Sequence, residues 1–125
     1  MPIFKNPGDK GRHVEKLAHK HLLKQGLKPV AQNIRSPYGE IDLIMRDQLE
    51  WVFVEVRFRR SGAFGGGLES VDRSKCRKLV KTAEHYIQSN NKIRFDTCRF
   101  DIIEVAGKLS EPRINWVKDA FPADI

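Results

Sequence analysis

A chain of 125 residues is the size of one ordinary domain, so we expect a single domain whose core spans about residues 11–118. The formal net charge of +7 and the pI near 9.6 favour a polyanionic partner such as nucleic acid. Two cysteines exclude a disulfide framework and a zinc-binding spacing. The early charged residues, without a signal peptide or a membrane span, predict a cytoplasmic protein with no membrane partner.

Hydrophobic periodicity predicts the order helix, three strands, helix, two strands. The first helix ends at Gly26, and the Ser36 to Gly39 segment forms a turn between the first two strands. The expected bounds are 11–25 and 72–89 for the helices, and 27–33, 39–46, 51–60, 97–105 and 113–118 for the strands. This order predicts an α/β sandwich with a mixed central sheet flanked by helices.

The second and third predicted strands carry acidic groups in sequence that otherwise has the character of buried sheet. If residues 47–50 form the turn between them, the antiparallel register places Asp42 directly opposite Glu55. A two-residue turn would pair Asp42 with Phe53 instead. Facing carboxylates repel each other, and burial makes their ionised forms costly unless a positive charge lies between them. The first register therefore favours a divalent cation at this point.

An acidic pair within a basic protein is typical of a nuclease, which needs cations to hold phosphates and carboxylates to hold a metal. Binding of the ribosomal or chromatin type explains the positive charge equally well. It does not explain the carboxylate pair, which is the feature that separates the two interpretations.

Two further acids are candidates for the same site. Glu15 shares a side of the first helix with the apolar positions Ala18 and Leu22, so it either faces inward or pairs with Lys16 or His19 on the helix surface. Glu40 is either a third acid on the active face or the partner of a nearby arginine.

Basic residues follow the acidic pair along the chain and are candidates for binding phosphates. They are Arg59, Arg60, Arg73, Lys75, Arg77, Lys78 and Lys81. A solvated outer helix face is the alternative interpretation of the last five. Phe64, in the glycine-rich stretch 61–68, either wedges against a base or packs into the core. The four histidines are expected at the surface or its boundary, and Asp101 is expected to position the first helix through a buried hydrogen bond.

Asp42 followed by Glu55-Val56-Arg57, with Glu15 upstream, resembles the PD-(D/E)XK nuclease superfamily. The whole chain is more closely similar to the YraN-like family of small bacterial proteins, which is related to archaeal Holliday-junction resolvases. The matching segments are Gly11 with Glu15, Asn33-Ile-Arg35, Gly39 to Ile44, Val52 to Arg57 with Arg59, Phe64-Gly65, Lys75, and Arg99 to Ile103.

The resemblance implies a restriction-endonuclease-like three-layer sandwich and metal-dependent cleavage of branched or structured DNA. Asp42, Glu55 and the main-chain carbonyl of Val56 would bind Mg²⁺ or Mn²⁺, and Glu15 would complete the catalytic acidic site. The family pattern has lysine where this chain has Arg57. Arginine is never deprotonated in proteins, so Arg57 can bind a phosphate oxygen or orient a hydroxide but cannot act as a general base. Lys75 supplies the missing ammonium if its helix end approaches the site.

Three functions follow from these observations. The first is a DNA endonuclease of resolvase type, with a homodimer as the natural form for cutting two strands of a symmetric junction. The second is a non-catalytic DNA-binding module that has lost turnover through Arg57. The third is an assembly protein with incidental DNA affinity that collapses at modest salt.

Overall fold

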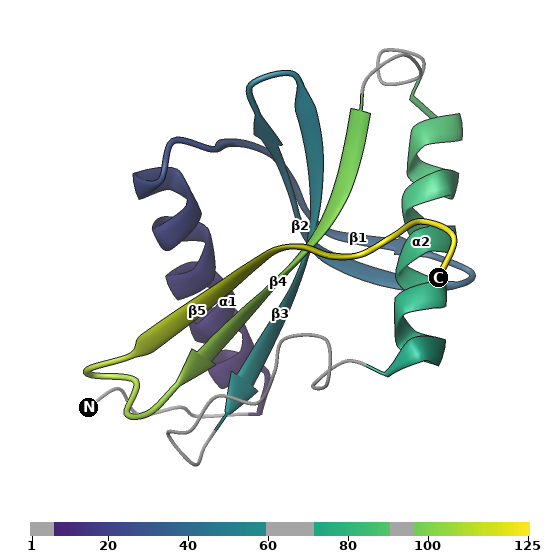
Figure 1. The fold of residues 1–125 in the computed structure, drawn as a ribbon. Helices are drawn as coiled ribbons and strands as arrows, with labels where there is room; N and C mark the ends of the chain where they lie inside the picture. The colour runs from purple at the N-terminus through teal and green to yellow at the C-terminus, as the bar shows by residue number, and fades with distance from the viewer. Residues whose placement is uncertain (1–6, 60–71, 91–96) are drawn as a thin grey trace.

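The computed structural model describes residues 7–59, 72–90 and 97–125. In this part of the chain the elements are α1 (Pro7–Lys24), β1 (Lys28–Ser36), β2 (Gly39–Asp47), β3 (Glu50–Arg59), α2 (Arg73–Gln88), β4 (Thr97–Ala106) and β5 (Arg113–Phe121) (Figure 1). Their order is the predicted one. The predictions for Arg60 and Phe64 lie outside the described residues.

The five strands form one mixed sheet whose spatial order, β1-β2-β3-β4-β5, is the order of the chain. Neighbouring strands are antiparallel except β3 and β4, which are parallel and are connected through α2. The two helices cover opposite faces of the sheet (Figure 1). The chain therefore has the predicted α/β, restriction-endonuclease-like three-layer sandwich. Neither helix of the described part is long and apolar enough to cross a membrane.

Alternating side chains of the central strands divide the core into two layers. Trp51 and Phe53 of β3 pack on the α2 side, whereas Val52 and Val54 pack on the α1 side. Because β2 and β3 are buried on both faces, any polar group on them must be held by a specific partner.

The register between β2 and β3 determines where the acids meet. Leu43 lies opposite Val54, and the pairing continues regularly to Asp47 opposite Glu50. Extended by one residue, this register brings Asp42 to Glu55, as the first predicted register required. The turn does contain two residues, but the predicted alternative, a pairing of Asp42 with Phe53, is wrong.

β2 and β3 separate at the acidic residues. The ladder of paired residues stops at Leu43 and Val54, and beyond it the Asp42 carboxylate accepts a hydrogen bond from the main-chain N–H of Val56 at 2.8 Å. In Figure 1, β1 and β2 turn away from β3 beyond this point, toward α2. A side chain thus replaces the main-chain pairing where the sheet divides.

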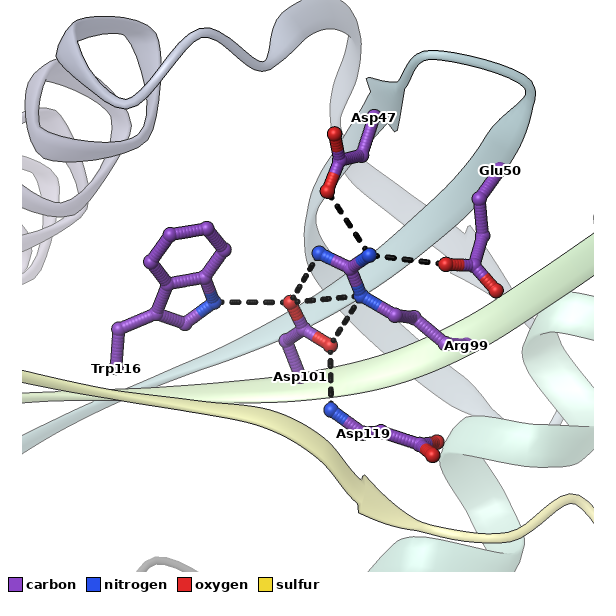
Figure 2. A network of polar contacts seen from close by, with 6 residues as sticks. All are labelled: Asp47, Glu50, Arg99, Asp101, Trp116 and Asp119. Atoms are coloured by element: carbon purple, nitrogen blue, oxygen red, sulfur yellow. Dashed lines mark hydrogen bonds and ion pairs between the residues drawn. The ribbon is translucent and has the colours of Figure 1, made fainter.

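A polar network links β2, β3, β4 and β5 at the end of the sheet opposite Asp42 and Glu55 (Figure 2). Asp101 of β4 is 1% exposed and accepts hydrogen bonds from the Trp116 indole and the Asp119 main-chain N–H, both at 2.9 Å. Arg99 donates to Asp101 and also, at 2.9 Å each, to Asp47 and Glu50 at the ends of the β2–β3 hairpin. Burial acts to lower the pKa of Arg99, but its hydrogen bonds and ion pairs with the three carboxylates outweigh burial and raise that pKa, so Arg99 stays charged.

Asp101 is structural, but its partners differ from those expected. Its hydrogen bonds go to β4 and β5, so the prediction that it positions the first helix is wrong. β5 skips residues in its pairing with β4 here, and Asp119 adopts a left-handed φ of 51°. The Asp101 carboxylate satisfies the N–H that this irregularity leaves without a ladder partner.

A second buried acid lies on β4, next to the end of β3. Glu104 is 0% exposed, and neither of its carboxylate oxygens has a hydrogen-bond partner among the residues that the structure describes. Its ion-pair partner is the Nε atom of Arg59, 3.7 Å away. Arg59 is therefore partly engaged within the fold.

Candidate active site

Asp42 and Glu55 form the centre of the site. Glu55 is only 5% exposed, Asp42 is half-buried, and both side chains line the same two cavities. Because the N–H and C=O of one strand residue point toward the same neighbouring strand, the Val56 carbonyl faces the same side as its N–H, toward Asp42. Two carboxylates and one carbonyl therefore converge where the strands separate.

Glu15 extends the acidic cluster from α1. Its carboxylate interacts with Asp42 and with the side chain of Asn33 on β1. With its amide nitrogen turned toward the acids, Asn33 donates to Glu15 at 3.2 Å and to Glu40 at 3.0 Å. Of the two predicted positions for Glu15, the inward-facing one is confirmed.

Asn33 is a site residue that the sequence interpretation did not select. It has a left-handed φ of 52° within β1, a conformation that asparagine tolerates better than most residues. The only signal for it in the sequence is its place in the segment that resembles the family. Its amide links acids that come from three different elements.

Glu40 fits both of its predicted positions. Its carboxylate lies 3.8 Å from the Arg35 guanidinium, and its side chain is 39% exposed. It also lines the cavity that Asp42 and Glu55 share. Because Glu40 is more exposed than Asp42 and Glu55, we interpret it as a neighbour that adds negative charge to the acidic pair.

Lys75 brings a cation to the pair. Its ammonium lies 3.4 Å from the Glu55 carboxylate, so the start of α2 does approach the site. Asp72 caps this helix by accepting the Lys75 main-chain N–H at 2.8 Å, which fixes the turn that carries the ammonium. Among the described residues, Lys75 forms the ion pair with Glu55 and Arg59 pairs with Glu104, while the charge of Arg57 also acts to lower the pKa of Glu55.

The site opens on both faces of the sheet. A cavity of about 370 Å³ on the α2 side and one of about 430 Å³ on the α1 side are both lined by Asp42, Glu55 and Lys75. Glu40 and Lys78 line only the first. The second cavity adds Glu15, Val56 and Arg57. A ligand at the acidic pair is thus accessible from either side of the divided sheet.

The remaining predicted phosphate ligands have different surroundings. Lys78 lines the α2-side cavity and Arg73 is exposed at the start of the helix. Arg77 instead donates to the main-chain oxygen of Ile125 at 3.4 Å. Lys81 lies over the ring of Tyr38, on the turn between β1 and β2.

The electrostatics of the site favour uptake of positive charge. Burial and the neighbouring Asp42 raise the pKa of Glu55 to about 7, against the opposing effect of Lys75. Burial, together with Glu40, also raises the pKa of Asp42, although the Val56 N–H opposes this. Burial and Asp42 raise the pKa of Glu15. The cluster therefore holds either protons or a cation more tightly than isolated carboxylates would.

The pH dependence of stability tests these shifts. In the folded state the pKa of Glu55 is about 7, so the group stays protonated up to about that pH, whereas in the unfolded chain it loses the proton near its ordinary pKa of 4.5. The folded state binds more protons in this window, so this group's contribution to the unfolding free energy falls as pH rises from about 4.5 to about 7. Glu55→Gln should remove that loss and be more stable than the wild type at pH 8.

Thermal unfolding in EDTA at pH 5 and pH 8 measures the effect, with Glu111→Gln as the control because Glu111 is exposed and outside the site. Identical pH slopes for wild type and Glu55→Gln would contradict the raised pKa of Glu55.

The donor set suits a hard cation. Carboxylate and carbonyl oxygens are the ligands that Mg²⁺ prefers, and Mg²⁺ usually keeps several waters and takes only one or two carboxylates. Within the described ranges, no three His, Cys, Asp or Glu side chains form a preformed metal-binding group. The residues thus fit a site of Asp42, Glu55 and the Val56 carbonyl completed by water.

Residues 14–105 match the model of the Uncharacterised protein family UPF0102. This chain belongs to that family. A UPF0102 protein of Saccharophagus degradans is 46% identical over 111 residues, covering 89% of this chain and 91% of the relative. A UPF0102 protein of Pseudomonas paraeruginosa is 43% identical over 120 residues, covering 94% and 96%. The predicted YraN-like membership is confirmed, since UPF0102 is the YraN family.

Among solved structures, that of Pyrococcus furiosus SfsA in complex with Ca²⁺ is similar, with a TM-score of 0.39 and 13% identity. The match covers 86% of the UPF0102 chain and 62% of the SfsA chain.

Proposed function

We propose that this protein is a Mg²⁺- or Mn²⁺-dependent DNA endonuclease that cuts branched or otherwise structured DNA. The observation that carries the proposal is the placement of Asp42 and Glu55 around the same two cavities at the division of the sheet, with the Lys75 ammonium 3.4 Å from Glu55. Carboxylates held beside a cation at an open cavity are the groups that hydrolysis of a phosphodiester requires. The net charge of +7 suits a polyanionic substrate.

Asp42, Glu55 and the Val56 carbonyl would hold the metal. When bound, the metal would lower the pKa of a water ligand and neutralise charge on the scissile phosphate. Glu15 supports this set through its interaction with Asp42, and the Asn33 amide holds Glu15 in place. Val56 also orients Asp42 by donating its N–H at 2.8 Å.

Lys75 has the role that the family pattern gives to a lysine on β3. Its ammonium can donate a hydrogen bond to a phosphate oxygen, or transfer a proton to the leaving oxygen. The guanidinium of Arg57 cannot make this proton transfer, because arginine does not lose its proton in proteins. Arg57 lines the α1-side cavity, where it can bind a neighbouring phosphate. The two cations thus serve different oxygens of one strand.

Replacement of Lys75 tests this division of roles. Lys75→Met should lower the cleavage rate by about 10²- to 10⁴-fold, the usual contribution of a proton-transfer group. Arg57→Met should weaken DNA binding more than it lowers the rate at saturating DNA. Lys16→Met is the matched control, since Lys16 is exposed on α1 beside Glu15. A Lys75→Met protein that cuts like the wild type would remove Lys75 from the mechanism.

The proposed function is tested with end-labelled four-way junction, linear duplex and single-stranded DNA, each incubated with Mg²⁺, Mn²⁺ or EDTA. We expect cutting of the junction with either metal and none in EDTA. Light scattering of the protein with and without junction checks the proposed homodimer. Absence of cutting on every substrate, in both metals, would contradict the proposal.

A non-catalytic DNA-binding module is the second candidate. It is favoured by Arg57 at the position of the family lysine and by the Lys75 ammonium, which forms an ion pair with Glu55 at 3.4 Å. This candidate predicts junction binding that is unchanged by EDTA, with no cutting. Affinity that vanishes at modest salt and shows no preference for branched DNA would instead favour an assembly protein.

A further inference from the structure

Tyr38 is an exposed aromatic residue at a fixed position. It lies on the turn between β1 and β2 and is 48% exposed. Its main-chain N–H donates to the Ser36 hydroxyl at 3.0 Å, and that hydroxyl donates to Thr82 of α2 at 3.1 Å. Thr82 in turn donates to the main-chain oxygen of Lys78 at 2.8 Å. A chain of hydrogen bonds therefore attaches the turn to α2, beside which the hairpin tip lies in Figure 1.

Gly39 makes the attachment close. Its φ of +150° is one that residues with a Cβ rarely adopt. A Cβ there would already contact the Thr82 hydroxyl, at 3.7 Å. The turn is thus constrained on both sides of Tyr38, and its ring is presented to solvent from a rigid support.

A small cavity lies against the Tyr38 ring. It has a volume of about 240 Å³ and is lined by Lys81, Glu84, His85 and Gln88 of α2. This is below the roughly 300–1,000 Å³ typical of drug-sized ligands, so it suits a single ring system. Glu84 accepts hydrogen bonds and Gln88 both donates and accepts them, as the edge of a nucleobase requires.

The cavity continues the surface of the candidate active site. Lys78 lines the acidic cavity, and Lys81, less than one helical turn later, lies over the Tyr38 ring with its ammonium 5.8 Å from the ring centroid. Glu40, two residues after Tyr38, also lines the acidic cavity. A DNA strand at the acidic pair can therefore pass the two lysines with its phosphates and reach the tyrosine with a base.

We propose that Tyr38 and the cavity beside it bind one unpaired base of the strand that occupies the active site. The inference rests on the proposed function and deepens it by naming the structural feature that is recognised. Aromatic side chains bind exposed bases by stacking, whatever the sequence, and flanking cations hold the backbone. Bases within a duplex are stacked on each other and do not reach such a ring. The site thus selects strands at branch points and ends.

Binding in EDTA tests the proposal separately from cleavage. Fluorescence anisotropy would measure the affinity for short single-stranded DNA in which one abasic position is moved along the strand. Tyr38→Ala should weaken binding by roughly 5- to 150-fold, the range for loss of one stacked base. Tyr38→Phe should bind like the wild type. Leu49→Ala is the control, because Leu49 is 76% exposed on the turn between β2 and β3.

The decisive test is whether the effects of Tyr38→Ala and of the abasic position on the binding affinity depend on each other. One abasic position should weaken wild-type binding by the same factor as Tyr38→Ala, and should weaken Tyr38→Ala no further. Additive losses, or unchanged binding by Tyr38→Ala, would overturn the base site. Coupling without DNA cleavage would support the base site and contradict the proposed nuclease function. Cleavage without coupling would support the nuclease function and contradict the base site. Absence of DNA binding would contradict both proposals.

Discussion

Asp42→Asn is expected to reduce DNA cleavage by at least about 100-fold while leaving the fold intact. Residues that only support metal ligands already cost about 10- to 100-fold when replaced, and Asp42 is proposed as a ligand itself. The amide oxygen can still accept the Val56 N–H, which is now 2.8 Å from the carboxylate, so the local main chain should keep its position. The assay is initial cleavage rate on the preferred substrate in Mg²⁺.

The same substitution should raise stability in the absence of metal. Asp42 interacts with both Glu55 and Glu15, and its negative charge raises the pKa of each. Removing that charge relieves repulsion within a largely buried cluster. Higher stability combined with lost activity would mark Asp42 as functional, since functional groups are often held at a cost to the fold. Asp124→Asn is the control, because Asp124 is exposed near the C-terminus.

A fall in stability caused by misfolding would make the activity loss uninformative, and cleavage within about threefold of wild type, in a folded Asp42→Asn protein, would remove Asp42 from the proposed site. Circular dichroism and thermal unfolding in EDTA separate these two cases.

Asp101→Asn should be the most destabilising single substitution in the polar network. Its carboxylate is buried and accepts hydrogen bonds from the Arg99 guanidinium, the Trp116 indole and the Asp119 main-chain N–H. Removing one partner of a buried charge pair costs about 3–5 kcal/mol, a large share of the roughly 5–15 kcal/mol that stabilises a typical domain. Urea unfolding, followed by tryptophan fluorescence, measures the loss.

Two variants calibrate this value. Trp116→Phe removes a single donor and should cost about 1 kcal/mol through its hydrogen bond, in addition to its change in packing. Asp119→Asn should be close to neutral, because only the Asp119 main chain takes part and asparagine tolerates its φ of 51°. An Asp101→Asn loss no larger than that of Asp119→Asn would contradict the structural role.

Element order was predictable because it follows from local pattern, but the register was predictable only in part. The alternation of β3 excludes a slip by one residue, which would turn its hydrophobic side chains to the other face. Two registers that differ by two residues remained open, and the structure has the one that brings Asp42 to Glu55. The expected strand at 113–118 falls short of the observed Arg113–Phe121. The irregular pairing around Asp119 breaks the alternation there, so the pattern in the sequence ends before the strand does.

Contacts between distant elements were not predictable in the same way. The approach of Lys75 to Glu55 depends on where α2 docks, and the bridge from Asn33 to Glu15 depends on a left-handed residue within β1. Neither geometry has a periodicity that can be recognised in one sequence. Asp101 shows the same limit, because its burial was expected but the partners that satisfy it come from β5.

The identity of spatial and chain order in the sheet has a consequence for folding. β1, β2 and β3 form a meander of local contacts, whereas the parallel pairing of β3 with β4 must wait until α2 and the residues beyond it are available. During synthesis the N-terminal meander would emerge first, with the apolar segment Trp51 to Val54 on an unpaired edge. A nascent chain arrested after α2 would contain all of the proposed metal ligands, yet expose β3 as an apolar edge strand, which favours aggregation.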